Sequence, residues 1–267
     1  MQIKKYTAAN KEAWNEVMPK HQKASKEYLD KLYSQEGFII QSDSNIMQMF
    51  DEISVKGKNI IHLCCNNGIE LFSIKNMGAA RCVGVDISEI AIDEARERAD
   101  KYSIDCEFLC SDVFDIPNEY FNSFDIVHIT SGCIGWIPDI NVFFEICNKL
   151  LVKGGVFLIH EIHPFSEMLP FDSNPIENKT QIIEPYFRSE PIVENSSLDY
   201  VGKTQYEAKT QYWFVHTISA LINSLSVNGF IVKRFIESAK DISAGHSEIE
   251  KLNAGIPLSM IILAEKF

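Results

Sequence analysis

The sequence predicts an α/β fold in which a mostly parallel, doubly wound sheet is covered by helices on both faces. Short apolar runs that are typical of strands alternate with helical stretches between residues 59 and 160, and this alternation indicates a parallel sheet. The chain has 267 residues, of which 46% are hydrophobic and 23% charged. A chain of this size and composition can bury the core of one such domain with an insertion.

The N-terminal segment, residues 1–54, is expected to be helical. An apolar stripe predicts a helix over residues 8–18 that is broken at Pro19, because proline removes a helical hydrogen bond. Two further helical stretches are expected at residues 23–33 and 45–53.

The alternating part of the chain follows. Its five expected strands are residues 59–64, 81–86, 105–110, 124–129 and 156–160. Helices are expected from Gly68 to Asn76, from Ser88 onward and from Asp139 to Leu151. Ser88 is placed to cap its helix, since a serine side chain accepts a hydrogen bond from the first turn.

Residues 162–212 interrupt the alternation. They contain five prolines and short extended runs such as residues 181–183, so we expect an insertion, partly strand, over the carboxyl edge of the sheet. The core is expected to resume with a helix over residues 216–227, which ends at Gly229. Two strands, residues 230–237 and 258–265, are expected to follow.

Candidate ligand-binding residues follow three of the expected strands, where α/β sheets bind ligands. The turn from Cys64 to Glu70 leads into a helix start, whose free N–H groups suit an anionic group. Asp86 lies 18 residues after Gly68, at a strand end where a carboxylate is placed to bind ribose hydroxyls. Asp112 is placed to accept from an adenine amine, and Val113 or Phe114 to flank the ring.

These motifs resemble those of the class I S-adenosylmethionine-dependent methyltransferases. Residues 124–127 and 150–158, the latter containing Leu-Leu-Val-Lys-Gly-Gly, are similar to the family's fourth and fifth strands. The first loop departs from the family pattern, because His62 replaces the acidic residue and Cys64 and Asn66 replace two glycines. A similar His-Leu-x-Cys-x-x-Gly turn is found in small-molecule methyltransferase-like proteins.

The resemblance implies a Rossmann-like, seven-stranded sheet with an antiparallel C-terminal strand and S-adenosylmethionine as the cofactor. Residues 55–161 are then the cofactor-binding core, residues 1–54 and 162–212 form the lid over the acceptor, and residues 213–267 complete the sheet. The residues expected to bind the cofactor are Cys64, Asn66, Gly68, Asp86, Ile87, Asp112, Val113 and Thr130.

A general base is needed only where the acceptor atom carries a proton that must leave. His163 and Glu161, just after the fifth strand, and His21, in the N-terminal segment, are the candidates. Glu161 and His163 are alternatively anchors of a loop. The run from His160 to His163 is not expected to bind a metal, because its two histidines point to opposite faces of a strand.

Composition limits the partners and the compartment. The chain has 25 Lys and Arg against 37 Asp and Glu, a formal net charge of −12, and it lacks the basic run typical of nucleic-acid or membrane-surface binding. No apolar run reaches the roughly 18 residues of a membrane span. Seven scattered cysteines without a Cys-x-x-Cys pair indicate reduced thiols and a cytoplasmic location.

The sequence therefore predicts a methyltransferase that acts on a small molecule, and it leaves the methylated atom and the oligomeric state open. The alternative is a catalytically inactive protein that binds S-adenosylmethionine and acts as a regulator or partner subunit. A nicotinamide-dependent oxidoreductase is disfavoured, because the Gly-x-Gly-x-x-Gly loop is absent.

Overall fold

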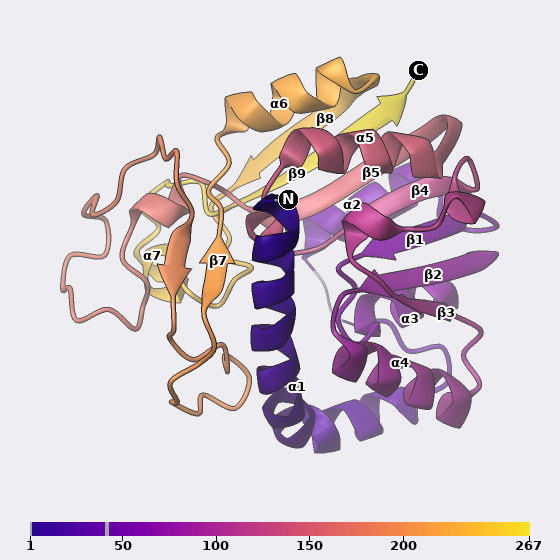
Figure 1. Cartoon of the computed structure of the whole chain (residues 1–267), viewed down its shortest axis with the longest axis horizontal. Coiled ribbons are helices and arrows are strands. Elements are labelled where there is room, and N and C mark those ends of the chain that lie inside the picture. Colours follow the sequence, from indigo (N-terminus) through magenta and orange to yellow (C-terminus); the bar gives the residue numbers. More distant parts are fainter. Residues whose placement is uncertain (1, 41–42) are drawn as a thin grey trace.

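The fold is built around a seven-stranded sheet (Figure 1), as seen in a computed structural model that describes residues 2–40 and 43–267. The order of its strands is β3-β2-β1-β4-β5-β9-β8. Their bounds are β1 (Asn59–Leu63), β2 (Arg81–Asp86), β3 (Glu107–Cys110), β4 (Phe124–Ile129), β5 (Leu151–Ile162), β8 (Phe230–Ser238) and β9 (Ser259–Lys266).

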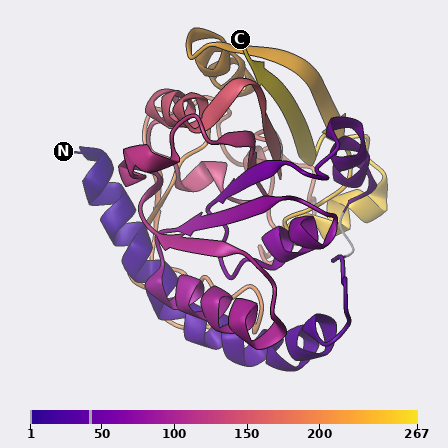
Figure 2. The same cartoon turned by 90° about the vertical axis from the view of Figure 1, so that its right-hand side faces the viewer.

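Strands β1 to β5 pair in parallel, and β9 runs antiparallel to both β5 and β8. The chain order reverses beside β1, which lies between β2 and β4. Figure 2 shows the twist of the sheet and the helices on both sides of it. The predicted fold, a mostly parallel sheet with a reversed C-terminal strand, is confirmed.

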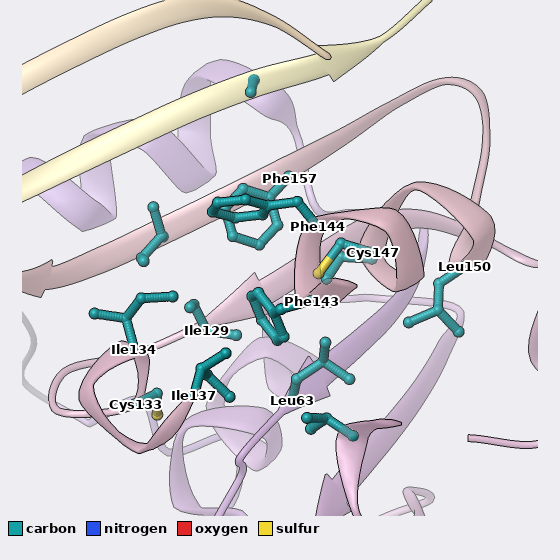
Figure 3. Close-up of a cluster of buried hydrophobic side chains, with 14 of the residues drawn as sticks. Leu63, Ile129, Cys133, Ile134, Ile137, Phe143, Phe144, Cys147, Leu150 and Phe157 are labelled. Carbon is teal, nitrogen blue, oxygen red and sulfur yellow. The ribbon is translucent and has the colours of Figure 1, made fainter. Parts of the chain in front are cut away.

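The described helices are α1 (Gln2–Tyr33), α2 (Ser44–Ile53), α3 (Ile69–Asn76), α4 (Glu89–Tyr102), α5 (Ile140–Leu150), α6 (Ile218–Val227) and α7 (Ser247–Leu252). Helices α5 and α6 pack on one face of the sheet, where Phe143 and Phe144 contact Phe157 of β5 (Figure 3). Helices α2 and α3 cover the other face. Alternate residues of the strands face these two layers, as the pleat of a strand requires.

Helix α1 runs without interruption through Pro19, so the predicted break at that residue is wrong. A proline inside a helix costs about 3 kcal/mol. Here the same helix buries residues on both sides of the proline, among them Val17 and Met18 before it and His21 and Leu29 after it. Tertiary burial of this face outweighs the local cost, which the sequence pattern alone does not reveal.

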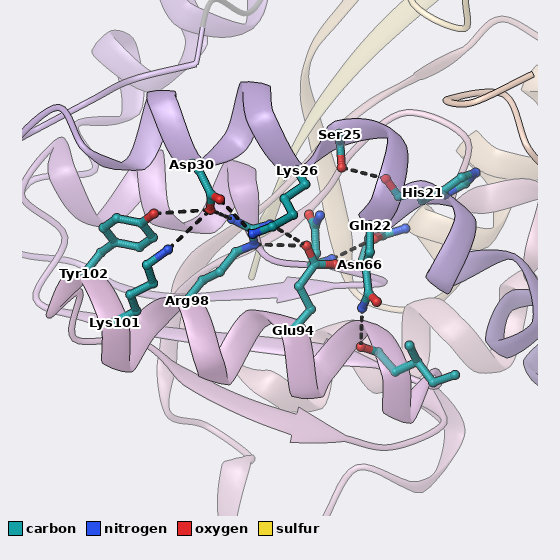
Figure 4. A network of polar contacts seen from close by, with 12 residues as sticks. His21, Gln22, Ser25, Lys26, Asp30, Asn66, Glu94, Arg98, Lys101 and Tyr102 are labelled. Carbon is teal, nitrogen blue, oxygen red and sulfur yellow. Dashed lines mark hydrogen bonds and ion pairs between the residues drawn. The ribbon is translucent and has the colours of Figure 1, made fainter.

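Polar contacts attach α1 to α4 (Figure 4). The carboxylate of Asp30 accepts hydrogen bonds from Arg98 at 3.4 Å and from the hydroxyl of Tyr102 at 3.3 Å. Further along the helix, the side-chain amide of Gln22 donates to the carbonyl of Ile90 at 3.3 Å. Helix α1 is thereby fixed across the edge of the sheet at which α4 begins.

The segment between β5 and α6 contains a small second sheet of β6 (Ile192–Glu194) and β7 (Gln211–Trp213). Residues 181–183, which look extended in the sequence, belong to neither sheet. The side chain of Asn10 on α1 pairs with the backbone of Tyr212, donating at 2.9 Å and accepting at 2.8 Å. Helix α1 therefore contacts both the small sheet and α4.

The short helix α7 was not expected from the sequence; it lies in the connection between β8 and β9. The predicted N-terminal segment, residues 1–54, includes Met1, Gln41 and Ser42, which lie outside the described residues. In the described part of the chain, no helix is both long and apolar enough to cross a membrane.

Candidate active site

One cavity of about 400 Å³ opens at the carboxyl ends of β1, β2 and β4 and at the segment that follows β3. Its volume is within the roughly 300–1,000 Å³ of small-molecule sites. Helix α1 and residues 200–201 of the insertion complete its wall. The predicted cofactor residues that line it are Cys64, Asn66, Asp86, Ile87, Asp112, Val113 and Thr130.

The turn after β1 has a left-handed backbone at three alternate positions. Cys64, Asn66 and Gly68 have φ values of 54°, 49° and 76°. These are the three positions at which the resemblance expected glycines, so the turn keeps its shape although two glycines are replaced. A non-glycine residue in this region costs about 1–2 kcal/mol, and such strain is common at binding sites.

Gly68, the N-cap of α3, is tightly enclosed although it does not line the cavity. A Cβ atom added there would lie 2.7 Å from Cε1 of Phe108 on β3. The close approach, which Cys64 and Asn66 do not have to satisfy, is what requires glycine here, and the positive φ adds to the preference.

Asp86 connects this turn to the start of α4. One carboxylate oxygen accepts from the backbone N–H of Asn66 at 2.8 Å, and the other accepts from that of Ser88 at 2.9 Å. Burial raises the pKa of Asp86 above its usual range, although these backbone donors oppose the change. Asp86 thus positions the strained turn and also presents a carboxylate to the cavity.

Asp112 caps a short 3₁₀ helix after β3, Val113–Asp115, and reaches α1. One of its oxygens accepts from the backbone N–H of Phe114 at 3.1 Å, and the other pairs with Lys4 at 3.2 Å. Lys4 also pairs with Asp115. The start of α1 is therefore tied to the loop that was expected to bind adenine.

The loop after β4, which includes Thr130, Gly132 and Cys133, forms another part of the wall. Glu161, 1% exposed, holds this loop from β5. Its carboxylate accepts backbone N–H groups from Gly132 at 2.5 Å and from Cys133 and Ile134 at 2.8 Å each. Burial raises the pKa of Glu161 to about 6, and the backbone donors limit the rise.

Glu161 and His163 do not line the cavity. Glu161 acts on the loop, as described. His163 is buried, with Nε2 3.0 Å from a carboxylate oxygen of Glu237 and Nδ1 accepting from the N–H of Phe165 at 3.1 Å. Both side chains therefore lie where they anchor loops, which is the alternative that the sequence left open. For His163 the reason is that β5 ends at Ile162, so the alternation of the strand does not continue to this residue.

His21 is the base candidate that lies in the cavity wall. Its ring is near those of Trp14 and Tyr200, with centroid distances of 6.3 and 4.6 Å. Tyr200 and its neighbour Asp199 were missed by the sequence analysis. They lie in the insertion, where no hydrophobic period marks which residues face inward.

No group of three or more His, Cys, Asp or Glu side chains is arranged to hold a metal ion in the part of the chain that the structure describes. Lys and Arg are likewise absent from the described lining, whereas Glu70, Asp86 and Asp112 belong to it. Asp112 is paired with Lys4, so Glu70 and Asp86 are the acids of the wall that have no ion-pair partner among the described residues.

The strand order with its reversed β9, the cavity at the switch point and the acid at the end of β2 define a Rossmann-like fold of the S-adenosylmethionine-dependent methyltransferase class. A sequence model described as "Methyltransferase domain" matches residues 54–209. The chain belongs to this methyltransferase-domain family, and the family predicted from the sequence motifs is confirmed.

Two solved structures show the same fold. The S-adenosylmethionine-dependent methyltransferase from Mesorhizobium loti is 22% identical, with a TM-score of 0.59 over 79% of this chain and 92% of that one. Geranyl diphosphate C-methyltransferase from Streptomyces coelicolor is 13% identical, with a TM-score of 0.57 over 84% of this chain and 79% of that one.

Curated relatives match a shorter part of the chain. Ubiquinone biosynthesis O-methyltransferase from Coxiella burnetii is 27% identical over 112 residues, which is 42% of this chain and 47% of the relative. A protein from Methanocaldococcus jannaschii is 36% identical over 64 residues, which is 24% of this chain and 29% of that protein. This chain thus spans less than half the length of either relative.

Proposed function

We propose that the protein transfers a methyl group from S-adenosylmethionine to a small-molecule acceptor. The main support is that predicted cofactor residues from four separate loops line one cavity at the switch point of the sheet. Family membership supports the same reaction type. Family membership leaves the acceptor open, because one fold serves many substrates.

The lining of the cavity suits this cofactor. Asp86 would accept hydrogen bonds from the ribose hydroxyls, and Asp112, with Ile87 and Val113 beside it, would hold the adenine. Asn66 and the start of α3 would face the methionine part. Glu70 and Asp86, which line the wall without a Lys or Arg partner among the described residues, suit a positively charged sulfonium group.

When bound, S-adenosylmethionine supplies a methyl group that its positive sulfur already activates. The protein then has to hold the acceptor atom in line and exclude water, and such positioning contributes up to about 7–11 kcal/mol. Helix α1 and the insertion are the proposed lid. His21 is the proposed base for an acceptor that must lose a proton.

The compartment and the class of partner are part of the proposal. The seven cysteines are free thiols, which fits a reducing cytoplasm. The net charge of −12 fits a small-molecule acceptor better than a nucleic acid.

The test is transfer of a labelled methyl group. Purified protein is incubated with S-adenosylmethionine labelled with ¹³C in its methyl group and with fractionated small-molecule extracts, and the products are followed by mass spectrometry. We expect a labelled product together with S-adenosylhomocysteine. Asp86→Ala should abolish both signals, and Asp93→Ala, an exposed site on α4, should preserve them.

The competing function is that of a regulatory protein that binds the cofactor without turnover. The altered first loop favours that alternative. S-adenosylhomocysteine binding with no labelled product in any fraction would support it and overturn the proposed transfer.

A further inference from the structure

The part of the cavity away from the cofactor loops has aromatic walls from three separate segments. Trp14 on α1 packs against Trp136 of the loop after β4, with ring centroids 5.6 Å apart at 77°. Tyr200 of the insertion contacts His21 and is itself 62% exposed, so it lies at the mouth of the cavity. Aromatic walls favour a flat, apolar ligand.

The charges of the cavity disfavour an anionic acceptor. A carboxylate or phosphate would find no Lys or Arg in the described lining to pair with it. Removing such a charge from water without a partner for it is costly. The acceptor should therefore not be an anion.

The hydrogen bonds of His21 fix its tautomer. Nε2 faces two acceptors, the carbonyl of Leu198 at 3.2 Å and a carboxylate oxygen of Asp199 at 3.5 Å. It therefore carries the proton. Nδ1 makes no hydrogen bond within the described residues, so its lone pair is free in a side chain that lines the cavity.

Asp199 is charged and held rigidly beside this imidazole. Its side chain is fully buried, and its oxygens accept from the N–H groups of Gly202 at 2.7 Å and Thr204 at 3.0 Å. Burial alone would raise the pKa of Asp199, but these donors lower it below the usual range. The carboxylate orients His21 and stabilises its protonated form.

We infer that the acceptor is an uncharged aromatic molecule with an ionisable hydroxyl group, and that His21, positioned by Asp199, takes the hydroxyl proton. This inference rests on the proposed methyl transfer. It names the substrate class, and it assigns Asp199 as a positioning residue that the insertion supplies.

The step balances in atoms and charge. A bond forms between the hydroxyl oxygen and the methyl carbon of S-adenosylmethionine while the carbon–sulfur bond breaks, and the sulfur keeps the electron pair and becomes neutral. The hydroxyl proton passes to Nδ1 of His21. The positive charge of the sulfonium therefore ends on the imidazolium, beside the carboxylate of Asp199.

A hydroxyl fits this geometry better than a protonated amine. A hydroxyl oxygen keeps lone pairs while it still holds its proton, so its attack and proton loss can occur together. An ammonium nitrogen has no lone pair and has to lose its proton first. Burial lowers the pKa of His21, although Leu198 and Asp199 oppose the change. An imidazole is already a far weaker base than an alkylamine, so it is poorly suited to that separate step.

The first test compares four probes built on one ring system: 2-naphthol, 2-methoxynaphthalene, 2-naphthoate and 2-naphthylmethylamine. Each is titrated by tryptophan fluorescence into protein saturated with S-adenosylhomocysteine, and methyl transfer is then measured with S-adenosylmethionine. We expect 2-naphthol and its methyl ether to bind and only 2-naphthol to be methylated. Preferred binding or methylation of the carboxylate or the amine would overturn the acceptor class.

Failure of the proposed function is distinguishable from failure of this inference. If S-adenosylhomocysteine does not bind to the folded protein, the methyltransferase proposal fails and the inference fails with it. If it binds and 2-naphthol does not, only the acceptor class is wrong.

The second test uses variants. His21→Gln keeps a donor for the carbonyl of Leu198 and should slow methylation at least about 100-fold, within the usual contribution of a general base, while S-adenosylhomocysteine affinity stays unchanged. His216→Gln is the matched control, because His216 Nε2 also bonds a backbone carbonyl, that of Ile137 at 2.8 Å, while His216 itself does not line the cavity. Equal rates in the two variants would contradict the role of His21.

Asp199→Asn tests whether Asp199 positions His21 or only supports the loop. The readout is the pH profile of kcat/KM. Loss of the carboxylate lowers the pKa of His21, so the acidic limb should move to lower pH. Tyr200 is the other titratable neighbour, and Glu70 and Asp86 line the same cavity; none of these changes in the variant. A lower rate with an unmoved limb would show that Asp199 only supports the loop.

Discussion

At the scale of single residues, the site depends on a turn that is strained where it lines the cavity. Cys64 and Asn66 adopt the left-handed conformation without being glycine. The carboxylate of Asp86 holds the N–H of Asn66, and Gly68 ends the turn against Phe108. The shape of the turn is therefore imposed by its neighbours and does not require glycine at every position.

Gly68→Ala tests this enclosure. Left-handed strain costs about 1–2 kcal/mol, and the overlap with Phe108 adds about 1–3 kcal/mol. Gly154→Ala is the matched control, because Gly154 has the same φ of 76° and no atom within 4 Å of an added Cβ. Denaturant unfolding should show a clearly larger loss of stability at Gly68, and equal losses would refute the enclosure.

At the scale of elements, the site is assembled by contacts between segments far apart in the sequence. Glu161 on β5 holds the loop after β4, and Asp112 pairs with Lys4 at the start of α1. Gly135 lies so close to Trp213 of β7 that an added Cβ would be 2.3 Å from the indole ring. The cavity walls are thus packed against one another through specific side chains.

The continuity of α1 gives a prediction at this scale. Pro19→Ala restores an N–H group within the helix and removes a ring that disfavours the helix, which stabilises the folded state by about 3 kcal/mol. Part of this stabilisation is offset because the unfolded chain has more conformational freedom without the proline. We expect the variant to be about 1–2 kcal/mol more stable in denaturant unfolding. A less stable variant would indicate that Pro19 marks a true helix end.

The sequence predicted those features of the fold and the site that depend on local sequence pattern. Apolar runs located the strands, and the rule that ligands bind at strand ends selected Asp86, Asp112 and Thr130. It did not predict the unbroken α1, which depends on tertiary burial, or Asp199, which only the folding of the insertion brings to His21. The side-chain direction of Glu161 depends on the loop that it binds, so anchor and base were indistinguishable in the sequence.

At the scale of the whole molecule, buried acids make stability depend on pH. Burial raises the pKa of Glu167 to about 7, although the indole N–H of Trp213 donates to it at 3.2 Å. The folded state then binds the proton more tightly than the unfolded state does. The protonated Glu167 side chain therefore contributes fully to stability below the ordinary glutamate pKa, and this contribution is lost as the pH rises to about 7.

Glu167→Gln should remove this dependence, because the amide stays neutral and its oxygen still accepts from Trp213. A pKa raised from 4.5 to about 7 corresponds to a gain of about 3 kcal/mol for the variant at pH 8, and to little change near pH 4. Denaturant unfolding across this range measures the difference. If the difference in unfolding free energy between the variant and the unmodified protein is constant with pH, Glu167 has an ordinary pKa.

We propose that the cavity at the carboxyl edge of the sheet binds S-adenosylmethionine despite its altered first turn. Isothermal titration calorimetry of the folded protein tests it most directly, with S-adenosylmethionine and S-adenosylhomocysteine as ligands and NADH and NADPH as controls. We expect one site of micromolar affinity for the first two, no binding of the nicotinamides, and loss of the site in Asp86→Ala. Failure of both sulfur compounds to bind would contradict it.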